Sequence, residues 1–464
     1  MQEGGDVTTE RGGQTPAGVP ERANRAGEDP RTAGLSRDWS WTEPTVWTAR
    51  MLTALDASIS TQQGVKGGKW YSLIDKLHAE ATLRAAFMQV EANRGAAGVD
   101  HVSVEHDAKD ADANLRRLSE ELRTGRYRPQ QIRRHYIPKP GSQEMRPLGI
   151  PTVRDRVVQT ALRMVMEPIY EKDFAAHSYG FRPGRGCKDA LRRVTGLLAA
   201  GYVHIVDADL KSYFDTIPKD RLKALIGRKV TDGRILALIA SFLDQGVLDG
   251  AQEWTPEQGT PQGAVVSPLL SNIYLDPLDH LMAERGFEMV RYADDFVVMC
   301  RSKEDAAAAL AVVQQWTAET GLTLHPTKTR LVDEREDGFD FLGYHFEAGK
   351  RWPRAKSRKK FRDTIRAKTK RTSGHSMTQI VADVNRTLQG WFEYFKHSRA
   401  PTFRMEDGFV RRRLRSILRK RSRRKGSAKA NGADQTRWPI AYFAALGLYS
   451  LQDAYALVCQ SSRR

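Results

Sequence analysis

The chain has 464 residues, more than one ordinary domain holds, so we expect two or three folded units with a large core. Lys and Arg number 74 against 56 Asp and Glu, and the resulting formal charge of +18 favours a polyanionic partner, most simply nucleic acid. Three widely separated cysteines exclude a disulfide framework and a cysteine-based zinc site, and no apolar run approaches the roughly 18 residues of a membrane helix, so we expect a cytoplasmic protein without membrane contact.

The N-terminal part of the chain divides into a tail and a helical region. The first 40 or so residues are rich in Gly, Pro, Glu, Arg and Thr and contain few large apolar residues, so we predict a disordered tail that ends near residue 45. Apolar residues then recur at helical spacing, for example Leu83, Phe87 and Val90. We therefore predict a helical extension over residues 46–105.

The middle of the chain alternates helical and strand-like patterns. "VVQTALRMVMEPIYEKDF" has the apolar spacing of a helix, whereas "YVHIVDADL" and "FVVMC" are short runs of strand-forming residues. This alternation is typical of a mixed α/β fold and predicts such a domain over about residues 100–345.

Two acidic clusters stand next to predicted strands. In "HIVDADLKSYFDTI", alternation places Asp207 and Asp209 on one strand face, and in "MVRYADDFVVMC" a tight turn between two strands presents Asp294 and Asp295. Like charges held together repel unless divalent cations bind between them, which is the arrangement that two-metal phosphoryl transfer uses. "YADD" alone is equally typical of an ordinary hairpin turn.

A third element lies between the two acidic clusters and favours the catalytic interpretation. "GTPQGAVVSPLLSNIYLDPLD" has two glycines and a proline that allow its backbone to approach a substrate, and it then continues into an apolar helix. Mg²⁺ is the expected ion, because it takes oxygen ligands and shares them with phosphates.

The C-terminal part is helical and strongly basic. In "LQGWFEYF", apolar residues fall at i, i+3, i+4 and i+7, which predicts a helix packed on a core. In "RRRLRSILRKRSRRK", residues 411–425, ten of fifteen positions are Lys or Arg and none is acidic. Such a run is either a solvated helix face or a nucleic-acid contact, and we favour the contact.

These motifs, in this order, resemble those of bacterial group II intron reverse transcriptases and maturases. "DADLKSYFD" is similar to motif A of the family, "GTPQGAVVSPLLSNIYL" to motif B and "YADD" to motif C, while "YRPQQIRRHYIPKPGSQEMRPLGIPTVRDRVVQ" and "SYGFRPGRGCKDAL" resemble its fingers blocks. The resemblance implies a right-hand polymerase with fingers, palm and a helical thumb. One departure is His101 in "GVDHVSVE", where the family usually has a small residue, often Gly, in a turn.

The resemblance also implies roles for single residues. Asp209, Asp294 and Asp295 match the catalytic triad that binds two Mg²⁺ ions, with Asp295 the less direct ligand. Phe214 matches the steric gate that favours deoxynucleotides, although without the motif it would be a core aromatic. The other residues implied to contact the incoming dNTP or the nascent base pair are Lys139, Arg146, Gln262, Gly263 and Lys328.

The last region resembles the thumb of these enzymes, which is called domain X in maturases. The residues implied to bind nucleic acid are Arg411, Arg412, Arg413, Arg415 and Lys420. No HNH-type endonuclease is expected, because Cys and His clusters are lacking. The predicted organisation is a tail (1–45), a helical extension (46–105), fingers and palm (106–350), a thumb or domain X (351–410) and a basic nucleic-acid-binding segment (411–464).

We therefore expect an RNA-directed DNA polymerase that uses dNTPs, template RNA and a DNA primer or target. The resemblance further implies that it binds its group II intron RNA, assists splicing and copies the intron into DNA during retrohoming, in a bacterial cytoplasm. Two alternatives remain open: an RNA-binding splicing cofactor without polymerase activity, and a reverse transcriptase recruited by its host. The sequence does not determine the oligomeric state.

Overall fold

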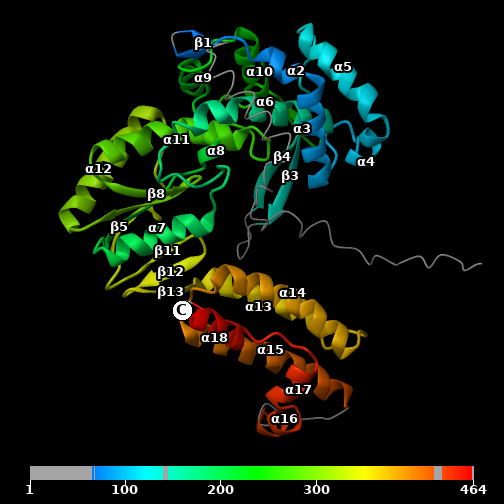
Figure 1. The fold of residues 1–464 in the computed structure, drawn as a ribbon, viewed down its shortest axis with the longest axis vertical. Helices are drawn as coiled ribbons and strands as arrows, with labels where there is room; N and C mark the ends of the chain where they lie inside the picture. The colour runs from blue at the N-terminus through cyan, green and yellow to red at the C-terminus, as the bar shows by residue number, and fades with distance from the viewer. Residues whose placement is uncertain (1–64, 67, 139–144, 423–430, 462–464) are drawn as a thin grey trace, which may run out of the picture. The chain divides into compact units, whose positions relative to one another are not determined.

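The computed structural model describes residues 65–66, 68–138, 145–422 and 431–461. The predicted tail, the first part of the helical extension and Lys139 lie outside these residues. Over the described part, the chain forms a mixed α/β region followed by a helical region (Figure 1), as the sequence predicts.

The N-terminal helices bury the residues that the helical spacing selected. Leu83, Phe87 and Val90 lie on α3 and have exposed fractions of 5% or less. They belong to a core that α3 shares with the long helix α6. The elements of this part are β1 (Val65–Lys66), β2 (Lys69–Trp70), α2 (Ile74–His78), α3 (Glu80–Asn93), α4 (Val104–Asp107), the 3₁₀ helix η1 (Ala108–Asp110), α5 (Ala111–Arg123) and α6 (Val153–Glu171).

A first four-stranded sheet, which we call the fingers sheet, has the order β4-β3-β6-β7. Its strands are β3 (Ile132–Pro138), β4 (Met145–Ile150), β6 (Val247–Asp249) and β7 (Gln252–Trp254). β3 and β4 are antiparallel and pair from Arg133↔Ile150 to Pro138↔Met145, and the residues that join them, 139–144, lie outside the described residues.

A second four-stranded sheet, the palm sheet, has the order β10-β5-β9-β8 and carries both acidic clusters. Side chains alternate along its strands, so each face of the sheet packs on a different core. On one face, Val206, Phe296 and Val298 pack with α11 and α12. On the other face, Ile205 and Val297 pack with α7. Its strands are β5 (His204–Asp209), β8 (Glu288–Tyr292), β9 (Asp295–Cys300) and β10 (Arg330–Asp333). The helices around it are α7 (Cys187–Ala199), α8 (Tyr213–Thr216), α9 (Lys219–Gly227), α10 (Gly233–Leu243), α11 (Ser267–Glu284) and α12 (Lys303–Thr320).

A small third sheet joins the palm to the helical region. It contains β11 (Phe339–Phe341), β12 (Tyr344–Glu347) and β13 (Lys350–Pro353) in sequence order. The hydroxyl of Tyr344 donates a hydrogen bond to the carbonyl oxygen of Tyr394 at 2.6 Å, and the hydroxyl of Tyr394 donates to the carbonyl of Leu342 at 2.7 Å. Because residue 394 lies on α14, these bonds tie the first thumb helices to the palm.

The helical region confirms the apolar stripe of "LQGWFEYF". Leu388, Phe392 and Phe395 are buried and Trp391 is half-buried, all on one face of α14. The boundary predicted between residues 410 and 411 falls within α15, because the change there is one of charge and not a helix-breaking signal. The helices are α13 (Ala355–Lys368), α14 (Met377–Phe395), α15 (Ala400–Arg421), α16 (Asn431–Arg437), α17 (Ile440–Ala445) and α18 (Leu451–Ser461).

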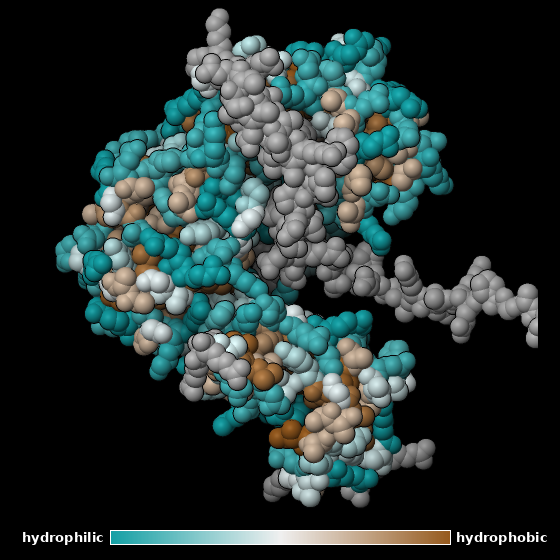
Figure 2. All heavy atoms as spheres, viewed as in Figure 1, coloured by the Kyte–Doolittle hydropathy of each residue, from teal (hydrophilic) through white to brown (hydrophobic). Residues whose placement is uncertain are grey.

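The surface agrees with the basic composition. On the face shown in Figure 2, hydrophilic residues predominate, and hydrophobic ones form small separate groups. Among the described residues, no helix combines the length and apolar character needed to cross a membrane.

The unusual His101 adopts a backbone conformation that favours glycine, with φ +58°. A Cβ in this left-handed region is strained by roughly 1–2 kcal/mol, although His tolerates it better than branched residues. We expect His101→Gly to raise the free energy of unfolding by about 1 kcal/mol after the added flexibility of the unfolded chain is subtracted. Urea denaturation of this variant beside His101→Ala, which keeps the Cβ, provides the measurement. An equal gain in both variants would show that the backbone strain is not the cause.

Candidate active site

Three carboxylates meet at one end of the palm sheet. β8 and β9 form an antiparallel hairpin in which Tyr292 pairs with Asp295, so Ala293 and Asp294 make the turn, and Ala293 takes a positive φ of +59°. On the other side of β9, Asp209 at the end of β5 pairs with Asp295. The register therefore brings Asp209, Asp294 and Asp295 together from positions far apart in the chain, as the sequence predicts.

The electrostatics of this end of the sheet disfavour three bare negative charges. Burial, together with the neighbouring charges of Asp294 and Asp207, raises the pKa of Asp295 to about 7. Burial also raises the pKa of Asp294, with a further contribution from Asp209. The carboxylates thus crowd one another in a poorly solvated place, where a bound cation is the usual compensation.

Four basic side chains surround the carboxylates. The ammonium of Lys328 lies 2.7 Å from Oδ2 of Asp209, and the guanidinium of Arg330 lies 3.2 Å from Oδ2 of Asp207. Arg146 and Arg354 act from farther away and lower the pKa of Asp294 and of Asp295, respectively. The resemblance implied that Lys328 contacts the incoming dNTP or the nascent base pair, and the structure places it directly on one of the three acids.

The donor set suits Mg²⁺ shared with a substrate better than a closed metal cage. Within the described residues, no three His, Cys, Asp or Glu side chains are arranged to hold an ion by themselves. Mg²⁺ typically takes only one or two carboxylates and completes its octahedron with water and phosphate oxygens. Partly exposed, mutually repelling carboxylates on adjacent strands fit that requirement.

The fingers sheet and the segment after β7 meet close to the site. The N–H of Gly149 on β4 donates to the carbonyl of Gln262 at 2.6 Å. Gly263 has φ +108°, and a Cβ added there would lie 2.5 Å from the carbonyl oxygen of Gly149. Only glycine fits this position, so the "PQG" turn is locked against β4, the strand that also carries Arg146.

Phe214 lies on the short helix α8, five residues after Asp209. Its ring contacts those of Tyr213 and Phe181 edge-on, with centroids 5.5 and 6.4 Å apart. The N–H of Thr260 donates to the carbonyl of Phe214 at 2.7 Å, which fixes the helix against the segment after β7. The ring remains partly exposed, so it is held by a core and still presents a free edge.

A buried ionic network behind the hairpin was not recognised from the sequence. Arg291 on β8 has 0% exposure, and its Nε donates to Oδ1 of Asp279 at 2.8 Å. Its Nη1 donates to Oδ1 of Asn272 and to the carbonyl of Ala293, both at 2.9 Å. Arg291 thereby holds the turn that presents Asp294. The available signal was a charged residue within an apolar strand.

The fingers block "SYGFRPG" closes the same network from the other side. The N–H of Tyr179 donates to the carbonyl of Arg291 at 2.9 Å, and the side-chain amide of Asn272 donates to the carbonyl of Gly180 at 2.9 Å. A Cβ on Gly180 would lie 2.1 Å from the backbone nitrogen of Ala293. The turn that carries Asp294 is therefore packed directly on the backbone of this block.

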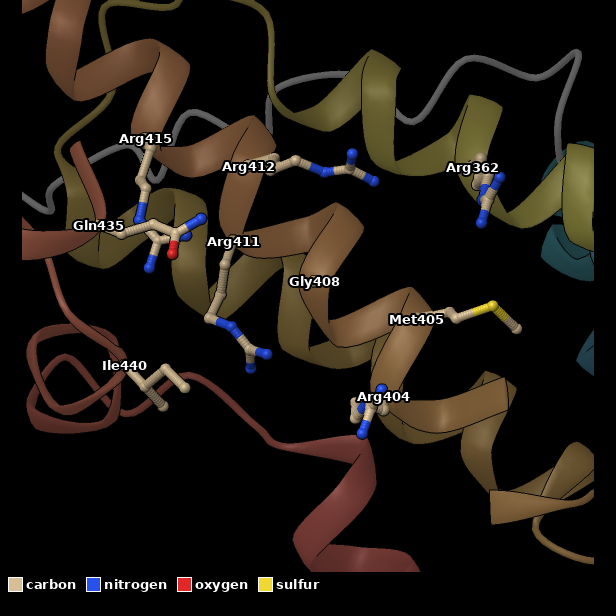
Figure 3. Close-up of a pocket in the computed structure, with 9 residues that line it drawn as sticks. All are labelled: Arg362, Arg404, Met405, Gly408, Arg411, Arg412, Arg415, Gln435 and Ile440. Carbon is tan, nitrogen blue, oxygen red and sulfur yellow. The ribbon is translucent and has the colours of Figure 1, made fainter. Parts of the chain in front are cut away.

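The predicted nucleic-acid-binding arginines of α15 have different environments (Figure 3). Arg413 donates to the carbonyl of Thr369 at 2.8 Å, and Arg415, which is 8% exposed, donates to the carbonyl of Trp438 at 2.9 Å. Arg412 and Lys420 are exposed. The run is thus an amphipathic helix in which part of the charge serves internal packing, and a nucleic-acid contact is best sought at its exposed members.

Comparison with known proteins identifies the families to which two regions of the chain are similar. Residues 137–346 match the family described as "Reverse transcriptase (RNA-dependent DNA polymerase)", and residues 358–437 match "Group II intron, maturase-specific domain". The chain is 34% identical over 286 residues to Protein YkfC of Escherichia coli (strain K12). This match covers 53% of this chain and 74% of YkfC.

Two further similarities are more limited. Over 174 residues the chain is 41% identical to the group II intron-encoded protein LtrA of Lactococcus lactis subsp. cremoris, which covers 38% of this chain but only 29% of LtrA. The chain is also similar to a chain of a solved structure, the partial Cas6-RT-Cas1--Cas2 complex, at 23% identity. This match covers 53% of this chain and 41% of the solved chain, and its TM-score of 0.33 is too low to inform the fold. Together, the two matched families and the similarity to YkfC show that this chain belongs to the group II intron reverse transcriptases and maturases, with an RNA-directed DNA polymerase domain followed by a maturase domain.

Proposed function

We propose that this chain copies RNA into DNA at the end of the palm sheet. The observation that carries the proposal is the convergence of Asp209, Asp294 and Asp295 through the β5–β9 register and the β8–β9 turn. Fingers and palm meet at this point, because Gly149 of β4 bonds to Gln262. A primer terminus and an incoming dNTP would react there, with the 3′-hydroxyl of the primer attacking the α-phosphate.

The residues around the site take complementary roles in this proposal. Asp209 and Asp294 would hold two Mg²⁺ ions, with Asp295 supporting them, and the ions would activate the attacking oxygen and stabilise the leaving oxygen. Arg146 and Lys139 would bind the triphosphate, and Lys328 would exchange its contact with Asp209 for one with the departing pyrophosphate. The chain itself contributes mainly positioning and electrostatic stabilisation.

The remaining predicted residues would select the substrates. Gln262 and Gly263 would line the nascent base pair, because their turn is locked against the fingers sheet. The free edge of the Phe214 ring would occupy the space of a ribose 2′-hydroxyl and so favour deoxynucleotides. Its packing on Tyr213 and Phe181 supplies the rigidity that such a gate requires.

We further propose that the helical region binds the parent intron RNA, assists its splicing and so allows the intron to be copied during retrohoming. Binding that favours the splicing-competent fold of the RNA increases the population of that fold without chemistry by the protein. A function as splicing cofactor alone does not require three carboxylates at one end of a sheet, where their mutual repulsion makes them costly to keep together. An intron RNA flanking the gene would distinguish this role from recruitment by the host.

Primer extension on an RNA template with dNTPs tests the proposal. We expect the wild type to extend a DNA primer with Mg²⁺ and to stop when EDTA removes the ion, because the carboxylates alone stabilise no developing charge. A double variant, Asp294→Asn with Asp295→Asn, should not extend the primer under either condition. If neither protein extends it while both bind RNA, the splicing-cofactor function takes precedence.

A further inference from the structure

A strained aromatic residue lies beside Phe214. Phe181, in the fingers block "SYGFRPG", has a φ of +59°, in the left-handed region that a bulky side chain rarely adopts. Such a conformation persists only where the surrounding structure holds it, and it occurs most often at functional sites. The strain at Phe181 therefore has to be offset by contacts of its neighbours in the chain.

The residue before Phe181 is fixed on the turn that carries Asp294. The carbonyl of Gly180 accepts a hydrogen bond from the side-chain amide of Asn272 at 2.9 Å. A Cβ at Gly180 would lie 2.1 Å from the backbone nitrogen of Ala293, so the two backbones are in direct contact. This contact and the hydrogen bond together keep the segment before Phe181 against the turn.

The residue after Phe181 is a buried arginine. Arg182 is 2% exposed, and its Nε donates to both carboxylate oxygens of Glu171 at 3.0 Å. Its Nη1 donates to the carbonyls of Ala175 and Ser178 at 2.6 and 2.9 Å. A buried charge is costly to separate from its partner, so Arg182 holds the backbone of Phe181 from the other side.

The ring of Phe181 is held in this way without being part of a hydrophobic core. The three cores formed by the described residues do not include it, and its side chain is half-buried. Its ring contacts that of Phe214 edge-on, with centroids 6.4 Å apart. Core packing therefore does not explain why a phenylalanine occupies a position where glycine would be unstrained.

Phe214 receives from Phe181 a contact that its own helix does not supply. Its ring contact with Tyr213 comes from the preceding residue on α8, so both rings move with the same helix. The hydrogen bond from Thr260 holds the backbone carbonyl of Phe214 and not its ring. Phe181 belongs to a different segment, which is fixed on the turn that carries Asp294. The contact between the two phenylalanine rings thus sets the position of the Phe214 ring relative to that turn.

We propose that Phe181 is a positioning residue that determines how strictly the site selects deoxyribonucleotides. Its ring restricts the rotation of the Phe214 ring, so the gate keeps its edge in the space of a ribose 2′-hydroxyl. This inference rests on the proposed function, in which Phe214 is the gate, and it assigns the strictness of the gate to a residue that would not itself contact the sugar. The strained backbone is what allows a segment already fixed on the Asp294 turn to place a ring at this point.

Single-nucleotide addition by the full chain tests the proposal, with a DNA primer on an RNA template, Mg²⁺, and either dATP or ATP opposite a template uracil. Discrimination is the ratio of kcat/KM for dATP to kcat/KM for ATP. Phe181→Ala should lower this ratio roughly two- to tenfold, which is the range that one aromatic pair contributes. The change should lie in the KM for ATP, because the gate acts by excluding the wrong sugar, whereas kcat with dATP should stay within about threefold.

Two further variants at position 181 distinguish positioning from structural damage. Phe181→Tyr keeps the ring and should discriminate as the wild type does. Phe181→Gly removes both the ring and the strain, so it should unfold at a higher temperature than Phe181→Ala and still lose discrimination to the same extent.

The matched control is Phe287→Ala. Phe287 is also half-buried, but it packs on the largest hydrophobic core and precedes β8, at the opposite end of that strand from the Asp294 turn. Its discrimination ratio should stay within about twofold of that of the wild type. An equal loss of discrimination in Phe287→Ala and Phe181→Ala would overturn the proposal.

A double-mutant cycle tests whether Phe181 acts through Phe214. Phe214→Ala should lower discrimination more than Phe181→Ala does, and adding Phe181→Ala to it should lower discrimination no further. If the effects of the two substitutions multiply, Phe181 acts independently of the gate and the proposal is wrong.

The failures of the two proposals are distinguishable. If Phe214→Ala relaxes discrimination while Phe181→Ala and Phe181→Gly retain the wild-type ratio, the role of Phe181 is overturned and the proposed function stands. If Phe214→Ala leaves the ratio unchanged, the gate and the role of Phe181 both fail, whereas extension with dATP still supports the polymerase. If the wild type does not extend the primer with dATP, both proposals are overturned.

Discussion

Asp294→Asn is expected to lower the rate of DNA synthesis by roughly three orders of magnitude or more, while its RNA affinity stays within a few fold of that of the wild type. Asp294 occupies the β8–β9 turn, beside Asp209 and within the field of Arg146. An amide of the same size is a poor ligand for Mg²⁺, so transition-state stabilisation is lost. RNA binding depends on arginines and lysines, and a carboxylate makes no favourable contact with phosphate in the absence of a metal.

Single-nucleotide addition and RNA-binding isotherms measure the two effects on the same preparation. Because burial and the charge of Asp209 both disfavour an ionised Asp294, the Asn variant should be at least as stable as the wild type in thermal unfolding. An unchanged rate of addition would remove Asp294 from the metal site. A parallel loss of RNA binding would indicate that the variant disturbs the fold and not only the chemistry.

Arg291→Met is expected to produce the largest loss of stability among the single substitutions considered. It leaves Asp279 charged and fully buried without its partner, which costs about 3–5 kcal/mol and should lower Tm by roughly 10 °C. The hydrogen bond from Nη1 to the carbonyl of Ala293 is lost as well. DNA synthesis should therefore fall even below the Tm of the variant, since the turn that carries Asp294 is no longer held.

Two companion variants separate these effects. Arg193→Met removes the exposed ion pair between Arg193 on α7 and Glu288, which lies on β8 as Arg291 does. This loss should lower the free energy of unfolding by less than about 1 kcal/mol. Arg291→Met combined with Asp279→Leu removes both buried charges and should recover much of the stability without restoring the rate. If Arg291→Met unfolds at the same temperature as Arg193→Met, the buried pair is not what secures the hairpin.

The parts of the site that the sequence predicts are those encoded locally. Alternation along β5 placed Asp207 and Asp209 on one face, and apolar runs on both sides of Asp294 and Asp295 defined a hairpin. The stripe that includes Leu388 and Phe392 followed in the same way from helical periodicity. Each of these predictions requires only the periodicity of apolar residues or the position of a turn, and a short segment of sequence contains both.

The contacts that the sequence does not predict depend on residues distant in the chain. Lys328 pairs with Asp209 across 119 positions, and no local pattern indicates that contact. In the sequence, Arg413 and Arg415 cannot be told from the other arginines of the basic run. In the structure they donate hydrogen bonds to the carbonyls of Thr369 and Trp438, so both contribute to packing within the protein. The partner of a charged side chain is determined by tertiary packing, and the periodicity of a single sequence does not reveal tertiary packing.

The junction between palm and helices has a consequence for dividing this protein. The ring of Tyr344 on β12 packs at a tilt of 53° against that of Phe395 on α14, with ring centroids 4.9 Å apart, and both rings belong to the core that covers one face of the palm sheet. A polymerase fragment cut after β13 would leave that aromatic surface facing water, where exposed apolar patches promote self-association. The polymerase activity and the proposed splicing activity are therefore better separated by point substitutions than by truncation, and a minimal enzyme would have to retain α14 as part of its polymerase.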